Sequence, residues 1–169
     1  MYIEQIFKGK NMRLIEENII KYIQSFATKD IINWMNLISG IIYNKLFFLI
    51  IIISYLLKYI TTKQIILLLL VNPIVWIIKN IIKRNRPYVN EPDIKLFDNN
   101  IIDTYSFPSG HSTFSFLLYF FLNDNKIINK YFIVFPLLVG FSRIMLGVHY
   151  ISDVIGGIIL AKLLSLLVR

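Results

Sequence analysis

The sequence predicts an all-α fold, a multi-pass transmembrane helix bundle of five to six spans with an amphipathic N-terminal helix. Hydrophobic residues make up 56% of the 169-residue chain, above the roughly 45–50% typical of soluble domains. The mean hydropathy is +0.63. The apolar residues stand in long runs, and a helix that crosses a bilayer needs ~20 largely apolar residues.

The N-terminal segment, residues 1–30, is expected to be amphipathic, and residues 31–169 are expected to form the transmembrane domain. Apolar residues recur at helical spacing among charged ones, which indicates a helix with one apolar face. They are Leu14, Ile15, Ile19, Ile20, Ile23 and Phe26. The pattern fits a helix on the membrane surface and a helix packed against the bundle equally well. A sixth crossing by residues 19–40 is also open.

Five apolar runs follow the amphipathic segment, and each is expected to form a span. A polar loop, residues 83–108, separates the second run from the third and carries four acidic residues. The runs cover residues 31–57, 64–82, Ser109–Leu122, 131–147 and 150–168.

The charge balance limits the classes of partner. The formal net charge is +8, with 18 Lys and Arg against 10 Asp and Glu, which suits nucleic acid, anionic lipid or an anionic substrate. Because the basic residues form no stripe on a soluble domain, we expect no nucleic-acid partner. The chain has no cysteine, which excludes disulfides and thiolate metal sites. The first residues do not resemble a cleaved signal peptide.

Two short motifs flank the polar loop. Six residues separate Lys79 from Arg86-Pro87, and alone such cations are ordinary interface anchors. Pro108-Ser109-Gly110-His111 opens an apolar run. The free N–H groups of a helix start bind anions, and Gly110 lets a ligand approach the backbone. Ser109 suits an N-cap role equally well.

A third motif comprises Ser142-Arg143, His149 and Asp153. Residues i and i+4 share a helix face, so Asp153 is placed to orient the His149 ring. Ionisable residues between two apolar runs cost about 2.5–3.5 kcal/mol each on insertion scales, which favours a functional role. Two predicted spans separate the polar loop from this motif, and two crossings return the chain to the same membrane face. All three motifs are therefore expected to meet there.

Together the motifs resemble the type 2 phosphatidic acid phosphatase (PAP2) superfamily, in its membrane lipid phosphate phosphatase branch. The pattern of that family is Lys-x6-Arg-Pro, Pro-Ser-Gly-His and Ser-Arg-x5-His-x3-Asp, and the resemblance covers roughly residues 40–168. Every specified position is present, as Lys79, Arg86, Pro87, Pro108, Ser109, Gly110, His111, Ser142, Arg143, His149 and Asp153.

The resemblance implies a division of labour. His149 would attack phosphorus and form a phosphohistidine, Asp153 would orient it, and His111 would protonate the leaving oxygen and then activate water. The phosphate would be bound by five residues, Lys79, Arg86, Ser109, Gly110 and Arg143. No Asp, Glu and His cluster has metal-ligand spacing, so no metal and no cofactor is expected.

The apolar runs around the motifs favour a membrane lipid phosphate as substrate and the bilayer as partner. The third run, about 15 residues, spans ~22 Å against a hydrocarbon core of ~30 Å, which would set its Ser109 end slightly below the head groups. The motifs do not choose among undecaprenyl diphosphate, phosphatidylglycerol phosphate, phosphatidic acid and lipid A phosphates. Lysines in the turns opposite the site, and the likeness to bacterial members, favour an active site on the outer face of the cell membrane.

Two other functions compete with this interpretation. A lipid phosphotransferase would pass the phosphoryl group from His149 to an acceptor alcohol. A non-catalytic lipid-phosphate binding membrane protein would need no intact catalytic set, and the complete motifs argue against it.

Overall fold

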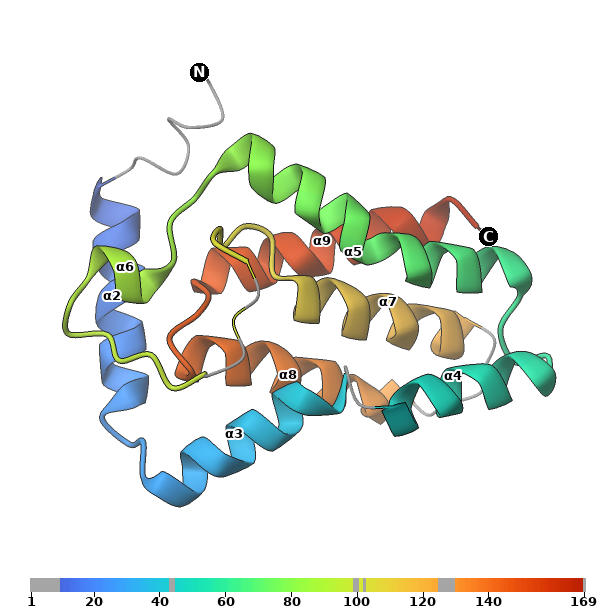
Figure 1. Cartoon of the computed structure of the whole chain (residues 1–169), viewed down its shortest axis with the longest axis horizontal. Coiled ribbons are helices and arrows are strands. Elements are labelled where there is room, and N and C mark those ends of the chain that lie inside the picture. Colours follow the sequence, from blue (N-terminus) through green and yellow to red (C-terminus); the bar gives the residue numbers. More distant parts are fainter. Residues whose placement is uncertain (1–9, 43–44, 99–100, 102, 125–129, 169) are drawn as a thin grey trace.

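The computed structural model describes residues 10–42, 45–98, 101, 103–124 and 130–168, and its regular elements are all helices, as predicted. In chain order they are α2 (Lys10–Gln24), α3 (Lys29–Ile41), α4 (Lys45–Leu56), α5 (Thr62–Ile82), α6 (Pro87–Asn90), α7 (Gly110–Asp124), the short 3-10 helix η1 (Lys130–Ile133), α8 (Val134–Met145) and α9 (Ile151–Leu166). Figure 1 shows them as one elongated bundle.

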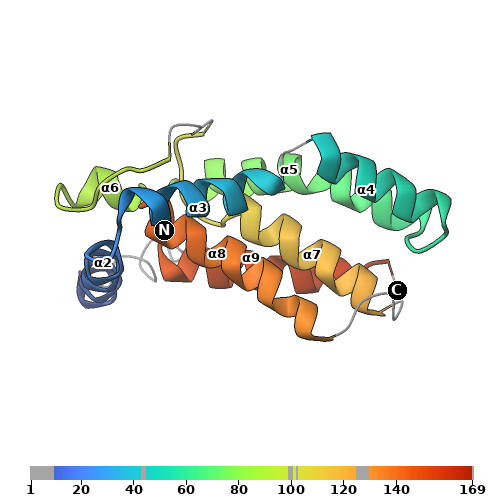
Figure 2. The same ribbon diagram turned by 90° about the horizontal axis from the view of Figure 1, so that it is seen from below.

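Helix α7 is the centre of the bundle. It packs against α5, α8 and α9, while α3 packs against α8. Figure 2 shows α7, α8 and α9 on one side, with α3, α4 and α5 above them. The core follows from the sequence of α7, since Phe114, Leu117 and Phe121 recur every three or four residues on one face and are buried against Val71 and Val139.

Four of the five predicted spans correspond to helices of nearly the expected extent. The runs 64–82, Ser109–Leu122, 131–147 and 150–168 are α5, α7, η1 with α8, and α9. The first run differs, because residues 31–57 form two helices, α3 and α4, in place of one. Residues 19–40 are also not one helix, since α2 ends at Gln24 and α3 begins at Lys29.

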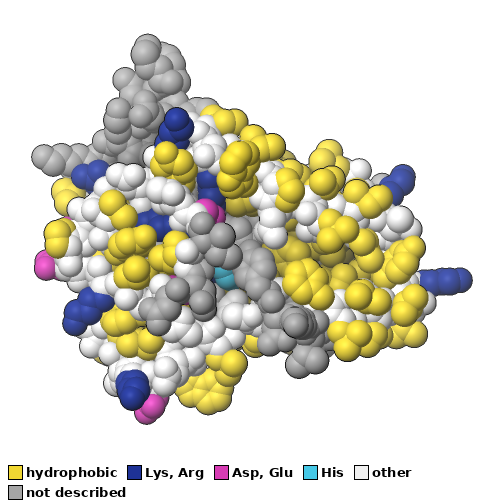
Figure 3. All heavy atoms as spheres, in the orientation of Figure 1, with side chains coloured by type: hydrophobic (Ala, Val, Ile, Leu, Met, Phe, Trp, Pro, Cys, Tyr) yellow, Lys and Arg dark blue, Asp and Glu magenta, His cyan; other side chains and the backbone are white. Residues whose placement is uncertain are grey.

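Within the described ranges, one helical segment, Thr62–Asn90, is long and apolar enough to cross a membrane by length and composition. The number of crossings therefore stays a prediction. Large apolar side chains nevertheless cover the outside of the bundle, with Leu69 66% exposed on α5 and Ile159 56% exposed on α9. Figure 3 shows hydrophobic side chains gathered over the side formed by α4 and α5.

The amphipathic N-terminal helix, α2, lies across one end of the bundle, where it packs against α8 (Figure 1). Its inward face combines Ile20, which is fully buried, with Glu16 and Glu17, which are also buried. Gln24 donates hydrogen bonds to the carbonyls of Lys95 and Met145. The opposite face exposes Met12, Ile15, Ile19 and Tyr22. Of the two interpretations of this segment, packing against the bundle therefore holds for the inward face of α2.

Candidate active site

The end of α5 brings the first motif to the site. Lys79 lies in its last turn, and the helix ends at Lys83, whose backbone is in the left-handed region with φ 53°. This conformation terminates helices. It turns the chain so that Arg86 approaches the link between α8 and α9, where its Nη1 donates to the Val148 carbonyl at 2.9 Å.

His149 is held in that link by its backbone. The amides of Val148 and His149 both donate to the Arg143 carbonyl, at 3.2 and 3.3 Å. Gly147 makes the turn, with φ +78°. A Cβ at this position would lie 2.3 Å from the Lys95 carbonyl oxygen. Only glycine therefore allows the polar loop that contains Lys95 to pack so closely against this turn.

Asp153 lies behind His149. Its Oδ2 accepts a 2.8 Å hydrogen bond from the Tyr150 amide and lies 3.5 Å from His149 Nδ1, with both side chains buried. This is the i, i+4 relationship expected from the sequence. The distance is long for a hydrogen bond, which is common in free enzymes. Burial, and then the positive charges of Arg86, Lys79 and Arg143, hold the pKa of His149 well below 6.5. The ring is therefore neutral and able to act as a nucleophile at neutral pH.

A cavity of about 610 Å³ unites the two histidines with the three motif cations. His111, His149, Lys79, Arg86 and Arg143 all line it. Figure 3 shows that a histidine side chain is visible on this face of the molecule. Along α5 the same cavity continues past polar and aromatic side chains, which are Asn72, Trp76 and Asn80.

The three cations contact acidic side chains of the polar loop. Lys79 Nζ donates to Asp103 Oδ2 and to the Tyr105 carbonyl, each at 2.9 Å, and Arg86 Nη2 donates to the other oxygen of Asp103. Arg143 Nη2 lies 2.6 Å from Asp98 Oδ2 in a fully buried pair, and its Nη1 contacts the Ser39 hydroxyl. Carboxylates of the chain itself thus contact the cations to which the resemblance assigns the phosphate.

The second motif begins α7. Gly110 and His111 line the cavity, while Ser109 is not among the residues that line it. The Ser109 hydroxyl accepts from the Ser112 amide at 3.3 Å and pairs with the Ser112 hydroxyl at 3.0 Å. This is the geometry of a helix N-cap. The Ser109 amide donates to the Asp153 carbonyl at 3.0 Å, which ties the start of α7 to the start of α9.

Sequence reasoning missed four charged residues around the site: Glu16, Arg84, Asp98 and Asp103. Arg84, Asp98 and Asp103 stand in the polar loop, outside the three motifs, and no spacing pattern in the sequence marks them. A signal existed for Glu16, because it stands four residues before Ile20 and eight before Gln24. Residues at that spacing share one helix face, so an acid lay on the face that packs.

The arrangement suits transfer of a phosphoryl group. Such reactions depend mainly on positioning and on neutralising the charge of the phosphate oxygens. Three cations and the backbone at the start of a helix supply that charge. Imidazole side chains can act as nucleophiles and can transfer protons, and two of them line the same cavity.

Comparison with known proteins agrees with the motifs. A sequence model of the PAP2 superfamily matches residues 40–169. Phosphatidylglycerophosphatase B of Bacillus subtilis is 40% identical over 78 residues, which cover 39% of this chain and 38% of that protein. Undecaprenyl-diphosphatase BcrC of the same organism is 40% identical over 63 residues, or 37% of this chain and 33% of that protein. The matched segments therefore span less than two fifths of these relatives.

Two crystal structures share the fold. The transmembrane PAP2-type phosphatidylglycerolphosphate phosphatase of Bacillus subtilis has a TM-score of 0.76 at 24% identity, and the similarity covers 98% of this chain and 88% of that one. LpxE of Aquifex aeolicus has a TM-score of 0.76 at 18% identity, over 89% of this chain and 92% of that one. Since the family model matches about three quarters of the sequence, this chain belongs to the PAP2 superfamily.

Proposed function

We propose that this protein is an integral membrane phosphatase that hydrolyses the phosphomonoester or diphosphate of a lipid through a phosphohistidine intermediate. The observation that carries the proposal is the single cavity lined by His149, His111, Lys79, Arg86 and Arg143. Membership of the PAP2 superfamily supports it, as do the names of relatives that act on phosphatidylglycerophosphate and undecaprenyl diphosphate.

In the first half-reaction the neutral imidazole of His149 attacks phosphorus. The P–N bond forms as the bond to the leaving oxygen breaks, and His111 gives that oxygen its proton. Asp153 stabilises the positive charge that develops on the ring. The three cations hold the phosphate oxygens, together with the backbone at Gly110. In the second half-reaction His111 takes a proton from water, which attacks the phosphohistidine and releases inorganic phosphate and His149.

A lipid substrate is supported by the surface around the cavity. The cavity continues along α5 beside Trp76, which is 61% exposed. Apolar side chains also cover the outer faces of α5 and α9, and exposed apolar area on this scale marks contact with lipid or partners. We further propose several spans for residues 31–169, residues 1–30 as a separate amphipathic segment, and an active site on the outer face of the cell membrane.

The central test is His149→Ala in purified, detergent-solubilised protein. We expect loss of phosphate release by at least about a thousandfold, because removing a nucleophile leaves only binding and charge stabilisation. Wild-type protein quenched during turnover of a radiolabelled lipid phosphate should carry acid-labile, alkali-stable label that the variant lacks. Asp93→Asn is the control, since Asp93 is exposed in the polar loop and is not among the residues that line the cavity. Unchanged turnover by H149A would contradict the proposal.

The substrate is tested with a panel of undecaprenyl diphosphate, phosphatidylglycerol phosphate, phosphatidic acid and lipid A phosphates in one detergent. At least one lipid should be turned over faster than water-soluble phosphate esters. Equal rates on the soluble esters would contradict a lipid substrate. An unchanged rate in EDTA is expected, and an added acceptor alcohol that captures most of the phosphate would indicate a phosphotransferase.

A further inference from the structure

Behind the catalytic pair lies a second, buried set of charges that joins the N-terminal helix to the site. Arg84 Nη1 donates to Asp153 Oδ1 at 2.5 Å. Arg84 Nη2 donates to Glu16 Oε2 at 2.8 Å. The side chains of Arg84, Glu16 and Asp153 are only 9%, 7% and 0% exposed. Neither Arg84 nor Glu16 lines the cavity that holds the motif cations.

We propose that Arg84 and Glu16 are positioning residues that hold the Asp153 carboxylate in the orientation in which it faces His149. This inference rests on the proposed phosphatase function, and it adds two residues outside the family motifs to the reaction. It also assigns the amphipathic N-terminal helix a part in catalysis.

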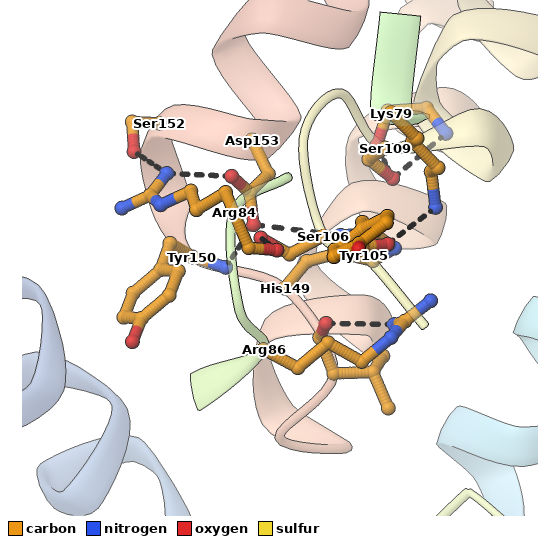
Figure 4. A network of polar contacts seen from close by, with 12 residues as sticks. Lys79, Arg84, Arg86, Tyr105, Ser106, Ser109, His149, Tyr150, Ser152 and Asp153 are labelled. Carbon is orange, nitrogen blue, oxygen red and sulfur yellow. Dashed lines mark hydrogen bonds and ion pairs between the residues drawn. The ribbon is translucent and has the colours of Figure 1, made fainter. Parts of the chain in front are cut away.

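The two oxygens of Asp153 have separate partners, and this fixes the plane of its carboxylate. Oδ1 accepts from Arg84, while Oδ2 accepts from the Tyr150 amide and faces His149 Nδ1. Figure 4 shows Arg84 between Ser152 and Asp153, with His149 on the far side of the carboxylate. Without the Arg84 contact, the carboxylate keeps only the backbone bond and is free to rotate about it.

Arg84 is itself held on three sides. Its Nη1 also donates to the Ser152 hydroxyl at 2.6 Å, and its guanidinium lies 4.0 Å from the centre of the Tyr150 ring. Glu16 binds the far edge of the guanidinium, and its second oxygen accepts from the Ser152 amide at 2.7 Å. A planar, five-donor guanidinium suits this set of partners, whereas an ammonium does not reproduce it.

The charges are arranged so that the buried aspartate is compensated. An ionised carboxylate away from water is costly unless it is paired and hydrogen-bonded. Asp153 is fully buried in the first turn of α9, and Arg84 supplies a positive charge on the side away from His149. Glu16 then balances Arg84, which leaves the negative charge of Asp153 available to the ring.

Attachment of α2 to the bundle does not depend on this pair alone. The same helix is anchored by Gln24, which binds the Lys95 and Met145 carbonyls, and by Glu17, which lies 3.2 Å from the Tyr150 hydroxyl. Lys21 also approaches Glu91 at 3.9 Å near the surface. The buried contact to Asp153 is therefore more than a means of docking the helix.

The test is a double-mutant cycle between Arg84→Gln and Asp153→Asn, with kcat and KM measured on the best lipid of the panel. Alone, R84Q should lower kcat about ten- to a hundredfold, the range found when outer partners of functional side chains are removed. Its KM should stay within about twofold because Arg84 does not line the cavity. In the D153N background, R84Q should cost about twofold or less, since residues that act through one another are not additive.

Four further variants make the cycle specific. Arg84→Lys and Glu16→Gln should each retain more activity than R84Q, and both serve in the same cycle if R84Q does not fold. Lys21→Gln removes a peripheral contact of the same helix and should leave kcat and melting temperature nearly unchanged. Arg86→Gln removes a proposed contact to the phosphate. The fold-losses of activity in R86Q and D153N should therefore multiply in the double variant.

The inference would be overturned if the kcat losses of R84Q and D153N multiply in the double variant. It would also be overturned if R84Q raises KM and leaves kcat unchanged. A wild-type protein that releases no phosphate from any lipid of the panel would instead sink the proposed function. The two failures are therefore distinguishable.

Discussion

The carboxylate of Asp103 lies 2.9 Å from the ammonium of Lys79, and the same carboxylate also contacts Arg86. Both cations are nearly buried, while the Asp103 side chain is 38% exposed. The two residues that should bind the substrate phosphate are thus paired with an internal anion in the free protein. If Lys79 and Arg86 bind the phosphate as proposed, a phosphate group that enters the cavity must compete with this carboxylate.

Asp103→Asn should therefore strengthen anion binding. A partly exposed ion pair is worth about 0.5–1 kcal/mol, so the inhibition constant of vanadate, and KM, should fall about two- to fivefold. The measurement is vanadate inhibition of purified wild type and variant. Asp93→Asn, on an exposed position of the same loop, should leave both constants unchanged. Weaker vanadate binding in D103N would show that Asp103 helps to form the phosphate site.

The pH dependence should reflect the lowered pKa of His149. Because burial, with Arg86 and Lys79, holds this pKa well below 6.5, the ring in the free enzyme stays neutral, and nucleophilic, as the pH falls through 6.5. The acid limb of kcat/KM assigned to His149 should therefore lie below 6.5. Removing a nearby positive charge with Arg86→Gln should move this limb to higher pH.

The substrate phosphate also titrates near pH 6, and comparison of the two enzymes on one substrate cancels that contribution. The profile should be recorded from about pH 4.5 to 8.5, within the range where the protein stays folded. An acid limb that is the same in R86Q and wild type would show that the limb does not report His149.

Much of the fold was predictable because long apolar runs specify helices directly. Thus α5, α7 and α9 begin and end within about two residues of the predicted runs, as is usual for helix ends. The sequence marks the break between α3 and α4 only weakly, since the run 31–57 carries no proline and only Gly40 and Lys45 stand near the break as a possible bend and a single charge. The inward face of α2 is marked only by spacing, since Glu16 shares a helix face with Ile20 and Gln24, while its charge is typical of a solvated side.

The candidate site was predictable only as far as its motifs extend. His149 and Asp153 are four residues apart, so helix geometry alone brings them together. The partners of the motif cations come from the polar loop, and Arg84 meets Glu16 across 68 positions of sequence. No periodicity reports such contacts, because they depend on how α2 and the loop pack on the finished bundle.

Ser109→Ala should affect stability more clearly than turnover. The Ser109 hydroxyl contacts the Ser112 amide and hydroxyl, and the residue does not line the cavity. Loss of an N-cap typically costs about 1 kcal/mol, so the melting temperature should fall while kcat changes by less than about tenfold. Ser115→Ala is a suitable control, since its hydroxyl donates to the Ser112 carbonyl within the same helix.

A drop in kcat for S109A comparable to that of Arg86→Gln, with an unchanged melting temperature, would contradict this assignment. It would indicate that the Ser109 hydroxyl turns to the phosphate once substrate is bound.

The close approach of α7 and α9 should be essential to the site. A Cβ at Gly157 would lie 2.8 Å from the Ser109 carbonyl oxygen and 3.1 Å from Ser112 Cβ. Because a backbone atom cannot yield as a side chain does, Gly157→Ala should push apart the two helices whose first turns carry His111 and Asp153. Overpacking of this kind typically costs about 1–3 kcal/mol.

Gly157→Ala should therefore lower both the melting temperature and kcat, the latter about tenfold or more, since small misplacements of catalytic groups have large effects on rate. Gly40→Ala is the matched control, because a Cβ on this α3 residue meets nothing within 4 Å. Helix propensity favours alanine by up to about 1 kcal/mol, so G40A should be neutral or slightly stabilising. If Gly157→Ala keeps the kcat and melting temperature of the wild type, as G40A should, the spacing of α7 and α9 does not position the catalytic groups.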